Sequence, residues 1–134
     1  MSLYSRTFYA DELSELFSDQ ENVANLLRVE AALAMSQARV GLVPESAARI
    51  IAECCRLEAI DVHSLKSDVV LGGNVAIPLV KQLTKVIKNR DFEASKYLHL
   101  GATSQDIIDT ATVLMIKAYA VSYTHLTLPT NREV

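Results

Sequence analysis

The stretch HLGATSQDIIDTA, residues 99–111, decides the fold of this 134-residue chain. Thr103 and Asp106 stand three residues apart directly before a run of apolar residues, which is the pattern of a capping box at the start of a helix. Apolar residues then recur at helical spacing from Ile107 to Ala118, and no strand-like alternation competes with them. We therefore predict a helix over residues 104–120.

Upstream of this stretch, the same two criteria predict a helical hairpin. Ser18 and the residues after it form a cap for a helix over 19–39, in which apolar residues recur every three or four positions. Gly41 fits the end of that helix, and Pro44 suits the first turn of a second helix over 44–57. The short connection between the two helices indicates that they pack side by side.

The region between the hairpin and residue 99 also reads as helical. Asp61 is a candidate cap for a short helix ending near Leu71, after which two glycines break the pattern. Pro78 opens a helix over 78–89, and a short helix follows over 91–97. The lysines of the 78–89 helix are expected to form a solvated face: Lys81, Lys85 and Lys88.

Composition supports an all-α class and one domain. The chain is 50% hydrophobic and 22% charged, with 4 Gly, 3 Pro and 6% aromatic residues, a balance that favours helices over sandwiches or barrels. Its net charge is −3, and its basic residues are scattered, so we expect neither a nucleic-acid nor a membrane partner. Polar residues and Arg6 occupy the place of a signal peptide's apolar core, which points to a cytoplasmic protein.

The two cysteines, Cys54 and Cys55, are adjacent. Neighbouring residues on a helix point in directions too different for an ordinary disulfide, so a reduced setting is expected. No His or Cys lies at the spacing of a zinc site, and we expect both cysteines to fill space in a buried helix. The sequence therefore predicts no metal site.

The character of the chain changes after Ala120. Residues 123–131 contain several β-branched residues and Pro129, without a helical period. We therefore expect the last helix to stop near Ala120 and divide the chain into a helical domain over 1–120 and a tail over 121–134. Such a tail is interpreted as the product of truncation, a frameshift or vector sequence.

Two glycine-bearing breaks, at residues 72–74 and 99–106, place polar side chains beside helix N-termini. The first turn of a helix offers unpaired N–H groups and a partial positive charge, which attract anions such as carboxylates. Hydroxyl and amide groups of residues 103–105 add donors. The alternative interpretation is that Thr103 and Asp106 only cap the helix and that His99 is structural.

Residues 99–111 resemble the first conserved segment of the fumarase/aspartase superfamily. Within that superfamily, the segment GGNVAIPLVKQL at residues 72–83 is similar to the bacterial carboxymuconate cycloisomerases, and so is the opening of the chain over residues 3–34. The resemblance covers about residues 2–120. Adenylosuccinate lyases share a related His-x-Gly-x-Thr-Ser segment but usually carry a His-Asp pair where this chain has Asn74.

The resemblance implies the N-terminal helical domain of the fumarase/aspartase fold, ending at the start of the first long bundle helix. It also implies a cytoplasmic homotetramer whose active sites each combine three conserved segments from three subunits. Only the first segment is expected here, with the catalytic base outside this chain, so the chain alone should be inactive. The implied reaction is lactonisation of 3-carboxy-cis,cis-muconate, a small tricarboxylate, to 4-carboxymuconolactone in the β-ketoadipate pathway, without a cofactor.

By position in the resembling segments, His99 and Ser104 are the expected catalytic residues. Asn74, Thr103, Ser104 and Gln105 are the expected substrate-binding residues. Two other readings stay open. One is a fragment of an adenylosuccinate lyase-like β-elimination enzyme, and the other is a non-catalytic helical interaction module that binds through the apolar stripes of residues 19–39 and 107–118.

Overall fold

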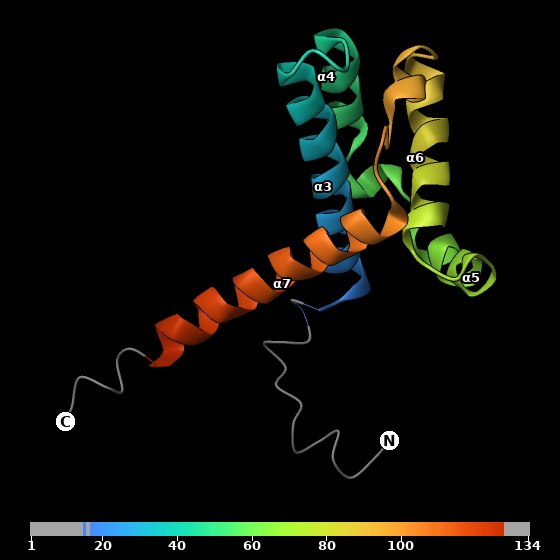
Figure 1. Cartoon of the computed structure of the whole chain (residues 1–134). Helices are drawn as coiled ribbons and strands as arrows, with labels where there is room; N and C mark the ends of the chain where they lie inside the picture. Colours follow the sequence, from blue (N-terminus) through green and yellow to red (C-terminus); the bar gives the residue numbers. More distant parts are fainter. Residues whose placement is uncertain (1–14, 16, 128–134) are drawn as a thin grey trace.

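The computed structural model describes residue 15 and residues 17–127, and all regular structure in this part of the chain is helical (Figure 1). The elements in chain order are α3 (Asp19–Arg39), α4 (Glu45–Cys54), the short 3-10 helix η1 (Leu57–Ala59), α5 (Val62–Gly72), α6 (Ala76–Arg90), η2 (Ala94–Tyr97) and α7 (Ser104–Thr127). The predicted all-α class is confirmed. None of the helices in the described ranges is long and apolar enough to cross a membrane.

The predicted hairpin is formed by α3 and α4. The hydroxyl of Ser18 accepts a hydrogen bond from the backbone N–H of Glu21 at 3.2 Å, which satisfies a donor that the first turn leaves unpaired. Gly41 has φ +76°, a left-handed conformation that glycine adopts without a Cβ penalty. Pro44 precedes the first residue of α4 rather than lying in its first turn.

The second helix of the hairpin is shorter than the predicted range of 44–57. It ends at Cys54, and η1 follows after a break. At the break, Arg56 has φ −124° and ψ 142°, which is extended backbone. An extended residue interrupts the i to i−4 hydrogen bonds, so the chain turns before the periodic apolar pattern ends.

The helix pair α5 and α6 is joined by the predicted glycine break. Asp61 caps α5 by accepting from the backbone N–H groups of His63 and Ser64, each at 3.1 Å. Gly73 ends α5 with φ +76°. α6 begins two residues before Pro78, which is tolerated because the first turn of a helix has no partner for its N–H groups.

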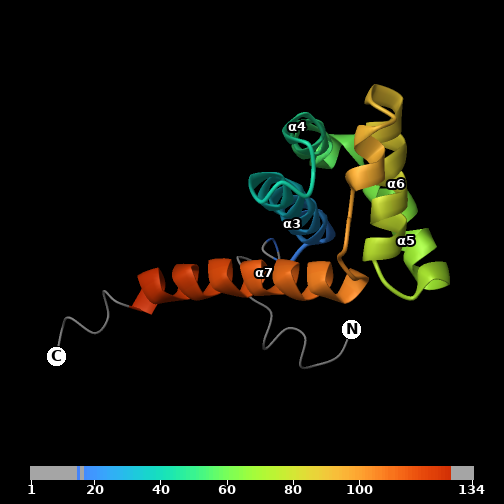
Figure 2. The same cartoon turned by 45° about the horizontal axis from the view of Figure 1, so that its top comes forward.

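The core lies where α3, α4 and α6 run alongside one another, with α7 crossing α3 steeply (Figures 1 and 2). Its fully buried aliphatic side chains are Leu26, Leu27, Ile51, Leu79, Leu83 and Ile87. Burying each such side chain contributes about 1.5–3 kcal/mol before entropy is counted. Lys81, Lys85 and Lys88 are exposed on α6, as the pattern predicted.

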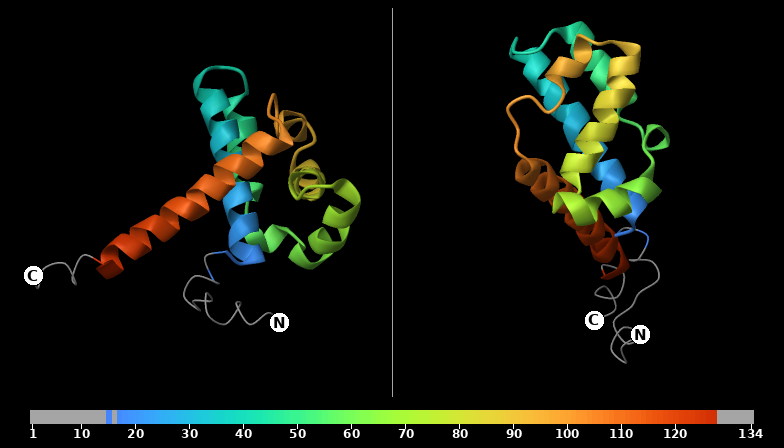
Figure 3. Two further views of the ribbon diagram at one scale, coloured as in Figure 1. Left: turned by 60° about the horizontal axis from the view of Figure 1, so that its bottom comes forward. Right: turned by 90° about the vertical axis from the view of Figure 1, so that its right-hand side faces the viewer.

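The prediction that the last helix stops near Ala120 is wrong, because α7 continues to Thr127. β-branched residues lower helix propensity by only a few tenths of a kcal/mol each. The hydroxyl of Thr124 donates to the carbonyl of Ala120 at 2.7 Å within the helix. α7 extends well beyond the other helices (Figure 3), and side chains on this part of it are exposed: Val113, Ile116 and Val121.

Candidate functional site

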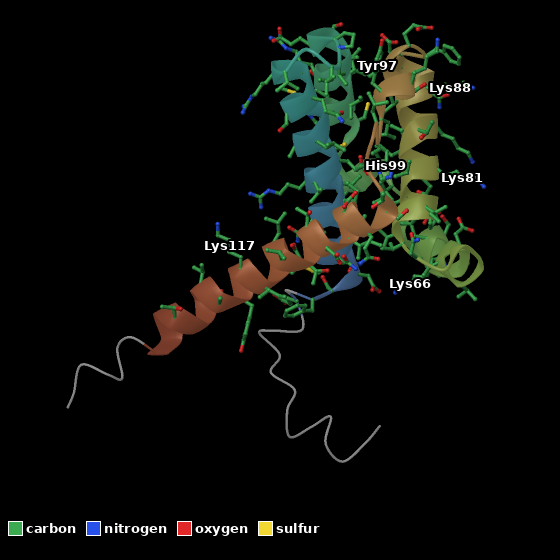
Figure 4. The ribbon with its side chains drawn as sticks, in the orientation of Figure 1. Lys66, Lys81, Lys88, Tyr97, His99 and Lys117 are labelled. Carbon is green, nitrogen blue, oxygen red and sulfur yellow. The ribbon has the colours of Figure 1, made fainter. Side chains whose placement is uncertain are left out.

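The predicted site is built around the connection between η2 and α7. This connection carries His99, which Figure 4 shows between α3 and α6. Its backbone is unusual, because His99 has φ 57° and Gly101 has φ 70°. A left-handed conformation is uncommon for a residue with a side chain and marks a place where the surrounding structure constrains the chain.

A buried carboxylate holds the imidazole of His99. Nδ1 of His99 lies 2.6 Å from Oε1 of Glu30 on α3. The side chain of Glu30 is fully enclosed, whereas that of His99 is 20% exposed. Burial raises the pKa of Glu30 above its ordinary value of 4.5, and the bond to His99 opposes that shift. One edge of the ring therefore faces the protein interior.

The first turn of α7 is capped by a reciprocal pair, as predicted. The N–H and hydroxyl of Thr103 both donate to Oδ2 of Asp106 at 2.8 Å, and the N–H of Asp106 donates to the Thr103 hydroxyl at 3.3 Å. These bonds lower the pKa of Asp106, with the backbone bond from Thr103 as the main cause. The donors of Thr103 that were expected to bind substrate thus already serve a carboxylate of the chain itself.

The other predicted residues near α7 differ in whether their polar side-chain groups already have hydrogen-bond partners. The amide of Gln105 donates to Oδ1 of Asp109 at 2.6 Å, along the helix surface. Ser104 is half-buried, and its hydroxyl has no hydrogen-bond partner in the described part of the chain. Ser104 is therefore the hydroxyl in this turn that is most available to a ligand.

Asn74 belongs to the second predicted break, at the start of α6. Its Oδ1 accepts from the N–H of Ile77 at 3.1 Å, so Asn74 satisfies one N–H of the first turn of α6 and keeps its amide N–H groups as donors. The N-terminal end of α6 lies beside the first turn of α7 in Figures 1 and 2. The fold thus brings the two helix N-termini, which are separate in sequence, to the same region.

Three acidic side chains lie in this region and bear on which ligands it can hold. They are Glu30, Asp106 and Asp109, while Lys81 and Lys88 project from the side of α6 away from His99 (Figure 4). A hollow of about 320 Å³ between α3 and α5 is lined by other residues, including Val23 and Val69. The described residues contain no cluster of three metal-ligating side chains.

Sequence reasoning missed Glu30 as the partner of His99 and Gln37 as a neighbour of Leu100. The amide of Gln37 donates to the carbonyl of Leu100 at 2.6 Å. The available indication was that Glu30 falls within the apolar stripe of α3, four residues after Leu26. A charged residue at such a position requires a partner, although its identity is not visible in the pattern.

The two cysteines are adjacent in sequence, at the end of α4. Both are free thiols, with Cys54 buried and Cys55 half-buried at the end of α4. Burial raises the pKa of the Cys55 thiol to about 12, and the nearby carboxylate of Glu30 adds to the shift. A thiol that resists ionisation is a poor nucleophile, so we assign Cys55 no chemical role.

Comparisons with known proteins agree with the resemblance. A family model described as "Lyase" matches residues 5–126. The chain is 46% identical over 115 residues to a 3-carboxy-cis,cis-muconate cycloisomerase of Pseudomonas putida, covering 86% of this chain and 27% of that protein. It is 37% identical over 108 residues to an adenylosuccinate lyase of Pyrococcus horikoshii, covering 81% of this chain and 23% of that protein.

A solved structure is also similar. The crystal structure of beta-carboxy-cis,cis-muconate cycloisomerase from Acinetobacter calcoaceticus matches with a TM-score of 0.80 and 44% identity, over 87% of this chain and 28% of that chain. The helical arrangement matches the N-terminal helical domain of the fumarase/aspartase fold, as predicted. The chain spans about a quarter of the length of the curated relatives it matches.

Proposed function

Since the chain belongs to the lyase family whose model matches residues 5–126, we propose that it is the N-terminal part of a 3-carboxy-cis,cis-muconate cycloisomerase. The observation that carries this proposal is the 46% identity to such an enzyme across a region that includes both glycine-bearing breaks. The geometry supports it, because Ser104 opens α7, His99 lies in the loop before it, and the start of α7 lies near the N-terminal end of α6.

The proposed reaction joins a carboxylate oxygen of 3-carboxy-cis,cis-muconate to a carbon of its own double bond, and a proton is added to the neighbouring carbon. As the carbon–oxygen bond forms, and before the proton arrives, negative charge develops on the neighbouring carbon and spreads onto its carboxylate, where positioned donors stabilise it. Ser104 would bind this carboxylate with its free hydroxyl, and Asn74 would donate from its amide. His99 would orient it with the ring nitrogen that does not face Glu30.

The remaining groups would come from elsewhere in the assembled enzyme. The hydrogen bonds around His99 involve acidic side chains, and Lys81 and Lys88 of α6 project away from it (Figure 4), so these groups do not offset three substrate carboxylates. We infer that a cytoplasmic homotetramer brings the cations and the group that gives the proton to carbon, which is the catalytic base of the reverse β-elimination, and that neither a metal nor an organic cofactor takes part. The roles of Thr103 and Gln105 in binding would require them to exchange their present carboxylate partners for substrate.

The boundary at residue 120 between the family domain and a tail stays a prediction. α7 and the family match both run a few residues past it. Sequencing the gene downstream of residue 120 tests the proposal directly. A continuing frame that encodes the other conserved segments supports the enzyme, whereas a stop or vector sequence supports a tail of foreign origin.

The activity is tested with a chimera in which residues 2–120 replace the matching region of the Pseudomonas putida enzyme. We expect the chimera to consume 3-carboxy-cis,cis-muconate, followed by ultraviolet absorbance. His99→Ala and Ser104→Ala should each lower kcat/KM by roughly 10²-fold or more. The matched controls are His63→Ala and Ser46→Ala, because both residues are exposed on other helices. Wild-type kinetics in the first pair would return His99 and Ser104 to structural roles.

The same chimera separates the proposal from the adenylosuccinate lyase-like alternative, which is supported by the 37% identity to an adenylosuccinate lyase. Turnover of adenylosuccinate, with none of carboxymuconate, would favour that alternative.

The 134-residue chain alone should turn over neither substrate. It should also self-associate through the exposed apolar side chains of α7, including Val113 and Ile116. Light scattering that shows a stable monomer would contradict this last expectation.

A further inference from the structure

One face of α3 holds the His99 loop at two points. Glu30 and Gln37 are seven residues apart, which places them two turns apart on the same side of the helix. Glu30 meets the ring of His99 at 2.6 Å, and Gln37 donates to the carbonyl of Leu100 at 2.6 Å. Ala34, which lies between them in sequence, is buried.

The loop needs such support because its backbone is constrained. His99 has φ 57°, in the left-handed region, and Gly101 has φ 70° two residues later. A side-chain-bearing residue persists in this conformation only where neighbouring contacts over-determine it. The two bonds from α3 act on the residue in that conformation and on the residue directly after it.

Each of the two side chains on α3 also buries an oxygen that has no hydrogen bond within the described part of the chain. Oε2 of Glu30 and Oε1 of Gln37 are buried and have no hydrogen-bond partner among the described residues. An apolar side chain of similar size would remove each unsatisfied oxygen, but it would also give up the bond to His99 or to Leu100. The bonds to those two residues are therefore what the carboxylate and the amide supply on this face of α3.

We propose that Glu30 and Gln37 are positioning residues for the site: Glu30 holds a proton on Nδ1 of His99, and Gln37 anchors the Leu100 carbonyl. This inference rests on the proposed role of His99 and deepens it. With Nδ1–H donated to Glu30, Nε2 is the nitrogen left for substrate. To bind a substrate carboxylate, His99 would donate from Nε2 with the ring doubly protonated, and the carboxylate of Glu30 would lie against the opposite nitrogen at 2.6 Å.

The position of the proton is measured on the 134-residue chain by ¹⁵N NMR of the histidine rings. The chain has 3 histidines, and His99→Gln identifies the signals of His99 by their loss. We expect a proton on Nδ1 of His99 in the wild-type chain. In Glu30→Leu the acceptor is lost, so the neutral ring should return to the Nε2–H form that unconstrained imidazole favours in water.

The conservative variant separates positioning from packing. In Glu30→Gln, the amide oxygen still accepts from Nδ1–H, so the ring should keep its Nδ1 proton. Glu21→Gln is the matched control on the exposed side of α3 and should change nothing. Nδ1 without a proton in the wild-type chain, or a ring that keeps the Nδ1 proton in Glu30→Leu, would overturn the role of Glu30. Where Glu30→Leu does not fold, the wild-type spectrum still decides, because Nδ1 without a proton in that spectrum overturns the role of Glu30.

Gln37 is tested by amide hydrogen exchange across residues 99–102. Gln37→Leu should accelerate exchange there about tenfold or more, while Gln20→Leu, at an exposed position of the same helix, should not. Equal exchange in the two variants would overturn the anchoring role.

In the chimera, Glu30→Leu should lower kcat on the order of tenfold to a hundredfold, and Glu30→Gln should recover part of it. An inactive wild-type chimera with the expected ring proton would refute the proposed function and leave the positioning intact.

Discussion

Replacing Thr103 by alanine tests how the start of α7 is held. The substitution removes the hydroxyl that accepts from the N–H of Asp106 at 3.3 Å and donates to Oδ2 of Asp106 at 2.8 Å. It leaves the bond from the backbone N–H of residue 103 to the same carboxylate, at 2.8 Å. Loss of a capping hydroxyl costs about 1 kcal/mol. For a chain of this size, that lowers the Tm by about 4 °C.

The measurement is thermal unfolding followed by circular dichroism. Thr112→Ala is the matched control, because Thr112 is exposed within α7 and its hydroxyl bonds only to the carbonyl of Ile108 in the same helix. Alanine has the higher helix propensity there, so the control should be neutral or more stable by about 0.5 kcal/mol. Thr103→Ser should stay close to wild type. Equal Tm values for Thr103→Ala and Thr112→Ala would refute the capping argument.

Three further predictions concern the core, the buried acid and the thiols. Leu83→Ala should lower the free energy of unfolding by about 2–5 kcal/mol, because Leu83 is fully buried; Val70→Ala, at a side chain 83% exposed, should change it by less than about 0.5 kcal/mol in the same urea titration. The raised pKa of Glu30 means that the folded state binds the proton of this carboxyl more tightly than the unfolded state does. The bound proton therefore contributes to the free energy of unfolding below pH 4.5, and this contribution is lost as pH rises through the folded pKa. Glu30→Gln should therefore gain stability relative to wild type as pH rises, and a difference that does not vary with pH would contradict the raised pKa. With its pKa raised to about 12 by burial, Cys55 should react slowly with a thiol reagent at pH 8 and rapidly in urea; equal rates would show that the thiol is already accessible.

The parts of the fold that were predicted correctly depend on neighbours in sequence. The bounds of α3 follow from the cap at Ser18, the apolar repeat and the glycine at position 41, all of which act within a few residues. The capping box at Thr103 and Asp106 is local in the same way. Errors occurred where weak local preferences compete, as at the end of α4 and along α7, where a few tenths of a kcal/mol per residue do not decide where a helix ends.

The sequence by itself determined the helical class, the caps and the polar residues that stand at two helix starts, because each depends on contacts three or four residues apart. Only the tertiary structure decided which of those residues meet others. The bond between His99 and Glu30 joins residues 69 positions apart, and that between Gln37 and Leu100 joins residues 63 apart. Such pairs depend on how α3 packs against the loop before α7, and helix periodicity contains no information about which helices face one another. The local pattern at Thr103 predicted both a helix cap and a binding site for a carboxylate. In the structure its hydroxyl donates to the carboxylate of Asp106, which is the cap.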